Sequence, residues 1–473
     1  MSSERSRKFF RDLGIYGLGV IGTRIITFLM LPLYTYFVDK SDYGYFDLCL
    51  NICLLLIPVV TLQLREGAFR FLLVSQSEDE RTSIITCVYK QFFVNLLIGT
   101  IIFFFIYFCF DISYLPETAI LLAVMSFHEI ILQVTRGLGK NKVYATSNIL
   151  NAFFIGILSV LFIVVMKMGV EGIYLTNILA RLLSIAYIEF NSHTFRHFSL
   201  KLNAWHNCKH ILGYTLPLIP ISMCYWVTSS CDRLFIKHFI GLEMNGLYAV
   251  AVRLTLIIQT LSIVFYQSWQ ETALLQYESK DRDAFFSKVF SSYAFVLTFI
   301  LICYTFALKM CYGWLIEARY SESLKFIYPL GVAALLNALA TSFYDLGYQC
   351  AKETKRAINA VLLTAILNLI LNMLLVPRIG IWGVIVTSII CYMFMNIYRY
   401  FDTRRFFTIS LNKVLLVPIA IIIISGLAFY LQHNLLFDFI YILISCLILI
   451  IFSPVDKHSL LNRFFGFKKK KVA

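Results

Sequence analysis

The chain has 473 residues, of which 59% are hydrophobic and only 14% are charged. Soluble domains contain roughly 45 to 50% apolar and about 25% charged residues, so this composition excludes an ordinary soluble globular protein. A formal net charge of +14 raises the question of nucleic-acid binding, but the placement of the cations, described below, argues against it. The composition predicts an all-α polytopic membrane protein.

Long apolar runs recur along the whole chain. A helix needs about 20 apolar residues to cross about 30 Å of hydrocarbon. The first run exceeds that length and contains Arg24 and Tyr36, which indicates a retained span and not a signal peptide. The runs predict about 14 transmembrane helices, at 13–38, 43–64, 84–110, 115–136, 144–167, 171–190, 211–237, 245–270, 285–311, 324–348, 357–376, 380–402, 413–431 and 436–453.

The Lys and Arg residues are distributed unevenly between the two sides of these spans. With the N-terminus placed inside the cell, most of the 41 cations fall in cytoplasmic segments, as the positive-inside rule requires. The sequence therefore predicts cytoplasmic N- and C-termini, with the KKKK run at 468–471 attracted to anionic lipid. The 12 cysteines lie mostly in predicted spans and form no spaced external set, so we interpret them as small apolar residues.

The two halves of the chain resemble each other. Each half has a short hydrophilic turn followed by Gly and then, two residues later, an aromatic residue, and further matches follow in the same order. The matching segments are 40–50 with 241–254, 137–142 with 345–350, and 168–177 with 379–388. We expect Gly44 and Gly246 to permit a tight external hairpin between the first two helices of each unit.

This repeat predicts the organisation of the chain. Six helices per unit is an even number, so both units run in the same direction and form a parallel repeat about an axis along the membrane normal. In a transporter of this architecture the substrate site lies between the two units. The predicted parts are a six-helix bundle at 1–190, a cytoplasmic linker at 191–210, a second six-helix bundle at 211–402, a terminal helix pair at 403–453 and a basic cytoplasmic tail at 454–473.

Charged residues inside the predicted spans are the candidate site residues. A charge at the bilayer centre costs at least ~2.5 to 3.5 kcal/mol on insertion scales, so such a residue marks a pathway or an ion pair. We expect no metal ligands, no cofactor and no catalytic residues, because no predicted loop is long enough for a soluble catalytic domain. The candidate substrate-binding residues are Arg24, Arg70, Glu129, Arg181, Asp232, Arg233 and Arg253.

Some of these charges have a structural interpretation. Glu66 and Arg70 have the i, i+4 spacing of an ordinary helical ion pair. Asp232 and Arg233 are adjacent and point in different directions on a helix, so we do not expect them to pair, and Asp232 is available to an Arg of another helix. Asp345, near the end of a predicted helix, is expected to be a solvated terminal charge.

Several motifs together resemble a known family. A helix with Arg24 and Pro32 leads to Tyr43-Gly44, and the next helix ends in Arg70-Phe71. Leu138-Gly139, the Gly-x-x-Gly at 169–172, the run DRLFIKHFIGLEMNGLYAVAVRL at 232–254 and YQSW at 266–269 follow in order. This series resembles the polysaccharide-biosynthesis branch, including Wzx-type O-antigen flippases, of the multidrug/oligosaccharidyl-lipid/polysaccharide (MOP) exporter superfamily.

The resemblance implies a MATE-like fold and a function in the bacterial inner membrane. The substrate would be a polyprenyl-diphosphate-linked oligosaccharide, such as an O-antigen, lipopolysaccharide, capsule or exopolysaccharide repeat unit. Arg24 would belong to a cationic central cavity, with Arg233 and Arg253 as candidates in the second bundle. The implied partners are membrane lipids and possible polysaccharide polymerase and chain-length machinery, with no nucleic acid.

Three alternatives stay open at this point. A cation-coupled multidrug exporter favours acidic cavity residues, whereas Arg24, Arg233 and Arg253 favour an anionic substrate. A lipid II flippase shares the expected fold, and a polytopic O-antigen polymerase or ligase would be an enzyme with a large external loop. Two negative charges moving outward gain roughly 4 to 5 kcal/mol per 100 mV, so the membrane potential can drive export, and Asp232 and Glu129 are the acids for proton or sodium coupling.

Overall fold

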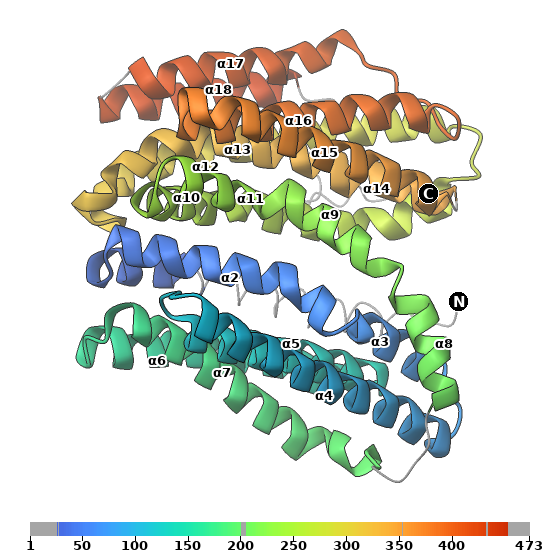
Figure 1. Cartoon of the computed structure of the whole chain (residues 1–473). Helices are drawn as coiled ribbons and strands as arrows, with labels where there is room; N and C mark the ends of the chain where they lie inside the picture. The colour runs from blue at the N-terminus through green and yellow to red at the C-terminus, as the bar shows by residue number, and fades with distance from the viewer. Residues whose placement is uncertain (1–25, 27, 200–204, 352, 432–433, 453–473) are drawn as a thin grey trace, which may run out of the picture.

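The structure is a computed structural model, and it describes residues 26, 28–199, 205–351, 353–431 and 434–452. Every regular element in these residues is helical (Figure 1). Twelve helical segments are long and apolar enough to cross a membrane, and Phe28–Phe37 and Leu436–Phe452 are shorter apolar helices. The predicted all-α polytopic fold with about 14 apolar helices is confirmed.

The helices form two groups followed by a terminal pair. The first group contains the helix Phe28–Phe37, α2 (Lys40–Val60), α3 (Leu64–Val74), α4 (Glu78–Cys109), α5 (Leu115–Gly137), α6 (Asn141–Ser159), the π-helical segment η1 (Val160–Val165) and α7 (Gly169–Ser192). The short segment η2 (Thr194–His197) and helix α8 (Trp205–Thr215) lead to the second group.

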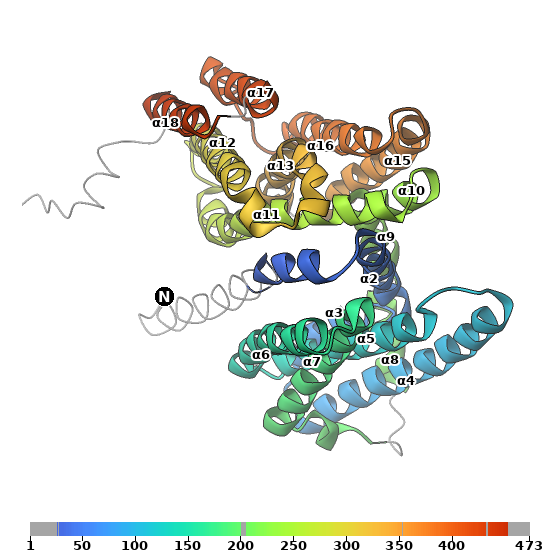
Figure 2. The ribbon, with the colours of Figure 1, turned by 90° about the vertical axis from the view of Figure 1, so that its left-hand side faces the viewer.

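The second group contains α9 (Leu218–Ser230), α10 (Asp232–Phe239), α11 (Leu242–Gln276), α12 (Arg282–Leu315), η3 (Ala318–Ser323), α13 (Leu324–Leu339), the π-helical η4 (Ala340–Tyr344), α14 (Asp345–Cys350), α15 (Thr354–Ile379) and α16 (Ile381–Thr403). The terminal pair consists of η5 (Lys413–Leu415), α17 (Leu416–Leu431) and α18 (Leu435–Phe452). Figure 2 shows the two groups one above the other, with α2 and α9 where they meet and the terminal pair at the outer edge of the second group.

The helices run back and forth between two ends of the molecule (Figure 1). The turns before α2, α5, α7, α11 and α16 lie at one end, which we call the Asp39 end. The connections before α4, α6, α12 and α15, and the segment 404–412, lie at the other end, which we call the Lys140 end. The predicted residue boundaries of the bundles, linker and tail stay predictions.

Two predicted helices are divided in the structure. The predicted helix 211–237 consists of α8, α9 and α10, because Pro217 lacks the N–H that would continue α8 into α9. Part of the predicted linker is therefore helical, and α8 packs against α3 and α4 of the first group. The predicted helix 43–64 ends early, where Leu62 and Gln63 adopt positive φ angles of 47° and 54°, and the chain continues as α3.

The structure supports two of the three matching pairs of segments at the level of local conformation. The segments 40–50 and 241–254 each contain the start of a long helix, α2 at Lys40 and α11 at Leu242. Gly169 and Gly380 both have φ of 60° at the start of α7 and α16, and Thr176 and Thr387 are both fully buried. The match of 137–142 with 345–350 is not reproduced, because 137–142 spans a turn whereas 345–350 is helix α14. The chain turns after α5 but continues as helix after η4.

The interpretation of all cysteines as small apolar residues was wrong for two of them. Cys87 of α4 and Cys208 of α8 form a disulfide with a Cα–Cα distance of 5.4 Å, which lies within the usual range for that bond. Their sequence separation of 121 residues explains why spacing alone did not pair them. The bond links α8 to the first group, on which it also packs, although α8 precedes the second group in the chain.

Candidate functional site

An ion cluster is buried where the first group meets the second. Arg233 of α10 donates from Nε to Oδ2 of Asp47 in α2 at 2.8 Å, and Nη2 of Arg253 in α11 lies 4.0 Å from Oδ1 of the same carboxylate. The side chains of Asp47, Arg233 and Arg253 are 5%, 7% and 14% exposed. Two arginines of the second group therefore share one carboxylate of the first group.

Aromatic rings complete the surroundings of both guanidinium groups. Arg253 lies 5.0 Å from the ring centroid of Tyr43 and 5.8 Å from that of Tyr34, while Arg233 lies 5.5 Å from the ring of Tyr248. A cation over an aromatic face gains roughly 0.5 to 2 kcal/mol, more when it is desolvated. Arg253 is therefore held by two aromatic side chains of the first group in addition to Asp47.

Asp232 has a separate environment made of neutral donors. It accepts hydrogen bonds from Tyr248 Oη at 2.8 Å, Asn372 Nδ2 at 3.1 Å and Ser388 Oγ at 3.3 Å, and it is buried. As predicted, it makes no ion pair with Arg233. Among the described residues no arginine of another helix forms an ion pair with Asp232, and Asp47 pairs with Arg233 and Arg253 instead.

Arg181 and Glu129, both in the first group, have different partners. Arg181 donates from Nη1 to Asn177 Oδ1 at 3.0 Å and to the Asn177 carbonyl at 2.8 Å, and within the described part of the chain it forms no ion pair. Glu129 pairs with Arg65 at 3.2 Å, so its charge is neutralised by a residue outside the candidate set.

The structural interpretations of the Glu66–Arg70 pair and of Asp345 were wrong. Glu66 pairs with Arg65 at 3.5 Å and not with Arg70, which lies over the ring of Tyr214 at 4.3 Å. Arg24 lies outside the described residues.

Asp345 is also not the solvated charge expected. Its carboxylate lies 2.7 Å from Nη1 of Arg399, whose side chain is fully buried. Burial of an arginine in a protein interior requires a partner, and Asp345 supplies it from the neighbouring segment.

Asp47 is the site residue that sequence reasoning missed. It is the only acidic residue between positions 43 and 64, and a lone carboxylate inside an apolar run indicates an ion pair or a transport pathway. Its partners lie about 190 and 200 residues away in the chain, on α10 and α11, so no local spacing rule could pair them.

The backbones of α2 and α11 touch near the Asp39 end. A Cβ atom added to Gly44 would lie 2.6 Å from the backbone nitrogen of Gly246, and one added to Gly246 would overlap the carbonyl oxygen of Lys40. Asn245 Nδ2 donates to the Gly44 carbonyl at 2.6 Å. The prediction that the matched glycines are hairpin residues was therefore wrong. They lie inside the helices α2 and α11 and permit this close approach.

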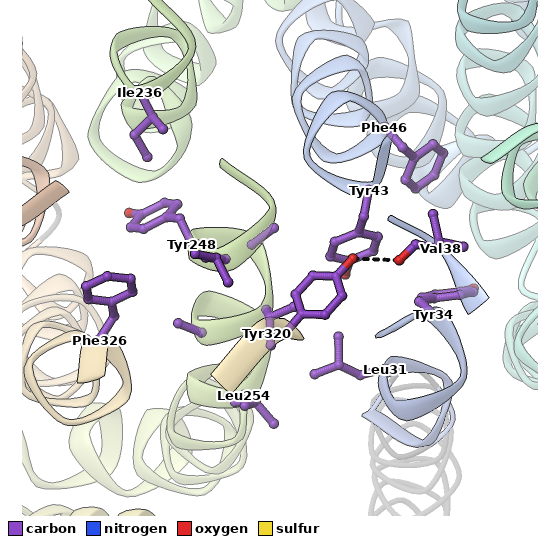
Figure 3. Packing of buried hydrophobic residues seen from close by; sticks show 14 of the residues in the cluster. Leu31, Tyr34, Val38, Tyr43, Phe46, Ile236, Tyr248, Leu254, Tyr320 and Phe326 are labelled. Atoms are coloured by element: carbon purple, nitrogen blue, oxygen red, sulfur yellow. Dashed lines mark hydrogen bonds between the residues drawn. The ribbon is translucent and has the colours of Figure 1, made fainter. Parts of the chain in front are cut away.

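Further contacts join the two groups at the Asp39 end. Tyr320 of η3 donates from Oη to the Val38 carbonyl at 2.9 Å, and Figure 3 shows its ring beside Tyr43 and Leu31. Arg319 forms an ion pair with Asp39 and donates from Nη2 to the Tyr36 carbonyl at 2.7 Å. These contacts, together with the glycine contact, close the molecule at this end.

Known proteins match the chain in sequence and in fold. A family model described as "Polysaccharide biosynthesis protein" matches residues 9–269, and no curated protein matches. A solved structure of the lipid II flippase MurJ in an inward closed conformation is similar, with a TM-score of 0.69, 14% identity and coverage of 97% of this chain and 100% of that one.

Two structures of MATE transporters are similar as well. An inward-facing multidrug resistance MATE family transporter of the MOP superfamily has a TM-score of 0.63 at 12% identity, covering 81% of this chain and 95% of that chain. A MATE in complex with MaD3S has a TM-score of 0.55 at 12% identity, covering 83% and 95%. At these identities the structural likeness concerns the fold.

Proposed function

We propose, from the premise that this chain belongs to the polysaccharide biosynthesis protein family and has the fold of the MOP superfamily, that it is a flippase for lipid-linked oligosaccharides. It carries polyprenyl-diphosphate-linked repeat units of O-antigen, capsule or exopolysaccharide across the bacterial inner membrane. In this proposal the Lys140 end faces the cytoplasm, in agreement with the positive-inside rule, and the Asp39 end faces outward. Transport proceeds by alternating access between the two groups of helices.

The arginine excess where the two groups meet is the observation that carries this proposal. Arg233 and Arg253 share the carboxylate of Asp47, and the neighbouring carboxylate of Asp232 is held by neutral donors. Arg181 of the first group adds a third guanidinium that forms no ion pair in the described residues. A diphosphate cannot cross hydrocarbon unsolvated, because burying an unpaired charge is very costly. Guanidinium groups bind phosphate oxygens through paired, charge-assisted hydrogen bonds, so these residues suit a diphosphate.

Asp47 acts in this mechanism as an internal substitute for the substrate anion. It belongs to the first group, whereas Arg233 and Arg253 belong to the second. A diphosphate that enters from the Lys140 end displaces Asp47 from the two guanidinium groups, and α2 and α11 then separate. Binding of substrate and closure of the Asp39 end then compete for the same two cations, which couples occupancy to the conformation.

The driving force in this proposal is the membrane potential. An anion with two charges that moves outward gains roughly 4 to 5 kcal/mol at 100 mV, inside negative. If collapse of the potential at constant pH gradient leaves flipping in vesicles unchanged, this part of the proposal fails. Asp232, with its three neutral hydrogen-bond donors, is then the first residue to test for proton or sodium coupling.

The charge pattern favours this function over a cation-coupled multidrug exporter. A cationic drug needs an available carboxylate, but Asp47 is occupied by two arginines, Glu129 by Arg65, and Asp232 by three neutral hydrogen-bond donors. A polymerase or ligase would need a large external domain, whereas the described connections at the Asp39 end are short turns. A lipid II flippase is the alternative that shares the fold, and the substrate pool distinguishes it.

The test uses cells that lack this protein, with the pool of polyprenyl-diphosphate oligosaccharide measured in lipid extracts. Wild-type protein should clear the accumulated repeat unit, and Arg253→Gln should not. Arg378→Gln is the matched control, because Arg378 is exposed on α15 and, among the described residues, hydrogen-bonds only the Leu374 carbonyl of its own helix. An unchanged pool with normal surface polysaccharide would refute the function, and accumulation of lipid II instead would identify the alternative substrate.

A further inference from the structure

A polar cavity lies at the Lys140 end, away from the ion cluster. Its volume is about 320 Å³, and it opens between the start of α12 and the segment that leads into the terminal pair. The cavity is lined by Ala284, Ser287, Lys288, Ser291, Ser410 and Asn412. None of these residues takes part in the proposed transport site.

Hydrogen bonds fix both walls of this cavity. Ser287 donates from Oγ to the Asp283 carbonyl at 2.6 Å and accepts from the backbone N–H of Ser410 at 2.9 Å. Thr408 donates from Oγ1 to Asp283 Oδ2 at 2.6 Å. The segment around residues 408 to 410 is therefore attached to the first turns of α12, and these hydrogen bonds hold the two walls of the cavity in place.

The free polar groups of the cavity are those that bind an anion. The Lys288 ammonium, the Ser410 hydroxyl and the Asn412 amide have no hydrogen-bond or ion-pair partner among the described residues. No carboxylate lines the cavity, and Asp283 beside it is engaged by Arg282 Nε at 2.8 Å and by Thr408. A cation, a hydroxyl and an amide thus face the same space without an acidic neighbour to neutralise them.

Apolar surface begins directly beside these donors. Leu411, Val414 and Leu416 are large exposed apolar side chains on either side of Asn412, and the exposed face of α17 continues from them. A ligand with a charged phosphate and long hydrocarbon chains fits a polar cavity that borders an exposed apolar surface. A free phosphate ion would use the donors but not the apolar face.

We propose that this cavity binds the phosphate group of an anionic phospholipid, with its acyl chains lying along Leu411, Val414 and Leu416. Basic pockets between membrane helices at the cytoplasmic side are suited to lipid headgroups. The bound lipid joins α12 to the segment that precedes α17, so it attaches the terminal pair to the second group. This site is independent of what the protein transports.

The test measures phosphatidylglycerol bound to the purified full-length protein by native mass spectrometry in detergent. Lys288→Gln should weaken the tightest phosphatidylglycerol binding about fivefold, the factor that one lysine contributes near an anionic lipid surface. Lys280→Gln is the matched control, because it removes the same charge from an exposed position at the same end but outside the cavity. Equal phosphatidylglycerol affinity in the two variants would overturn the proposal.

A second measurement separates a lipid from a free anion and excludes a folding defect. Equimolar inorganic phosphate should not displace phosphatidylglycerol, because it lacks the acyl contacts, and displacement would overturn the lipid assignment. Asn412→Ala removes a donor from the other wall and should weaken phosphatidylglycerol binding in the same direction. Both cavity variants should unfold at the temperature of Lys280→Gln in the absence of added lipid, and a lowered temperature would assign the loss to the fold and refute the site.

Discussion

Replacement of Gly246 by alanine should open the Asp39 end. The new Cβ would overlap the Lys40 carbonyl oxygen and lie 3.0 Å from the Lys40 carbonyl carbon, where ordinary contacts begin at 3.4 Å. Both neighbours are backbone atoms, so no side chain can rotate away and α11 must move away from α2. Overpacking of this kind costs typically about 1 to 3 kcal/mol.

This cost applies only to the conformation in which the two helices touch. It therefore shifts the equilibrium towards conformations open at the Asp39 end by roughly 5- to 150-fold, since each 1.4 kcal/mol is a factor of ten. The contacts of Arg319 with Asp39 and of Tyr320 with Val38 oppose the opening, and they should be lost together with the glycine contact.

Electron–electron distances between spin labels measure this shift. Cys109 at the end of α4 and Cys311 near the end of α12 are exposed free thiols on opposite groups at the Asp39 end. Gly246→Ala should add a longer Cys109–Cys311 distance, whereas Gly99→Ala, whose Cβ meets nothing within 4 Å, should not. Identical distance distributions in the two folded variants would refute the reasoning.

Three further predictions concern the buried charges and the disulfide. Asp47→Asn removes the charge that neutralises Arg233 and Arg253, so the melting temperature should fall and the free energy of unfolding should decrease by about 3 to 5 kcal/mol. Adding Arg233→Gln to this variant should restore part of the lost stability, and a strictly additive double-mutant cycle would contradict the pairing. Asp232→Asn removes the charge and keeps one oxygen that can accept from Tyr248 and Ser388, so any dependence of transport on a sodium or proton gradient should disappear while the dependence on membrane potential stays; an unaltered ion dependence would exclude this acid. Cys87→Ser should leave the α3–α8 packing intact, because Gly67 already lies close to Ile211 and Thr215, and limited proteolysis near residue 204 should then differ little from wild type; rapid cleavage there would show that the disulfide alone holds α8.

The number and type of elements could be predicted because they depend on local composition. Runs of apolar residues about 20 long specify membrane helices whatever their partners. The local breaks could not be predicted in the same way: the bend at Leu62 and Gln63 has no Gly, and only Pro58 upstream indicates it. Pro217 is visible in the sequence, but a proline inside an apolar run either kinks a helix or breaks it, and the sequence alone does not decide between the two.

The candidate site was predicted in part, and its gaps have a physical origin. The expense of a charge in hydrocarbon identified Arg233, Arg253 and Asp232 from the sequence alone. Their partners depend on which helices become neighbours, which is a tertiary property. For that reason Asp47 was overlooked.

The roles of the matched glycines were also beyond local reasoning. The sequence showed that Gly44 and Gly246 occupy corresponding positions, but a glycine can serve a turn or a close helix contact equally well. Only the packing of α2 against α11 distinguishes the two. The corresponding positions of two related units here lie against each other.

The attachment of α8 has a consequence for how the protein can be recombined. A chimera that exchanged halves with a related protein inside the connection at 193–204 would separate α8 from Cys87 and from its packing surface on α3 and α4. A junction at Leu216–Pro217 would instead keep α8 with Cys87 and with its packing surface on α3 and α4. The natural boundary between exchangeable modules therefore falls at a proline inside a continuous apolar stretch, and not in the hydrophilic connection that precedes it.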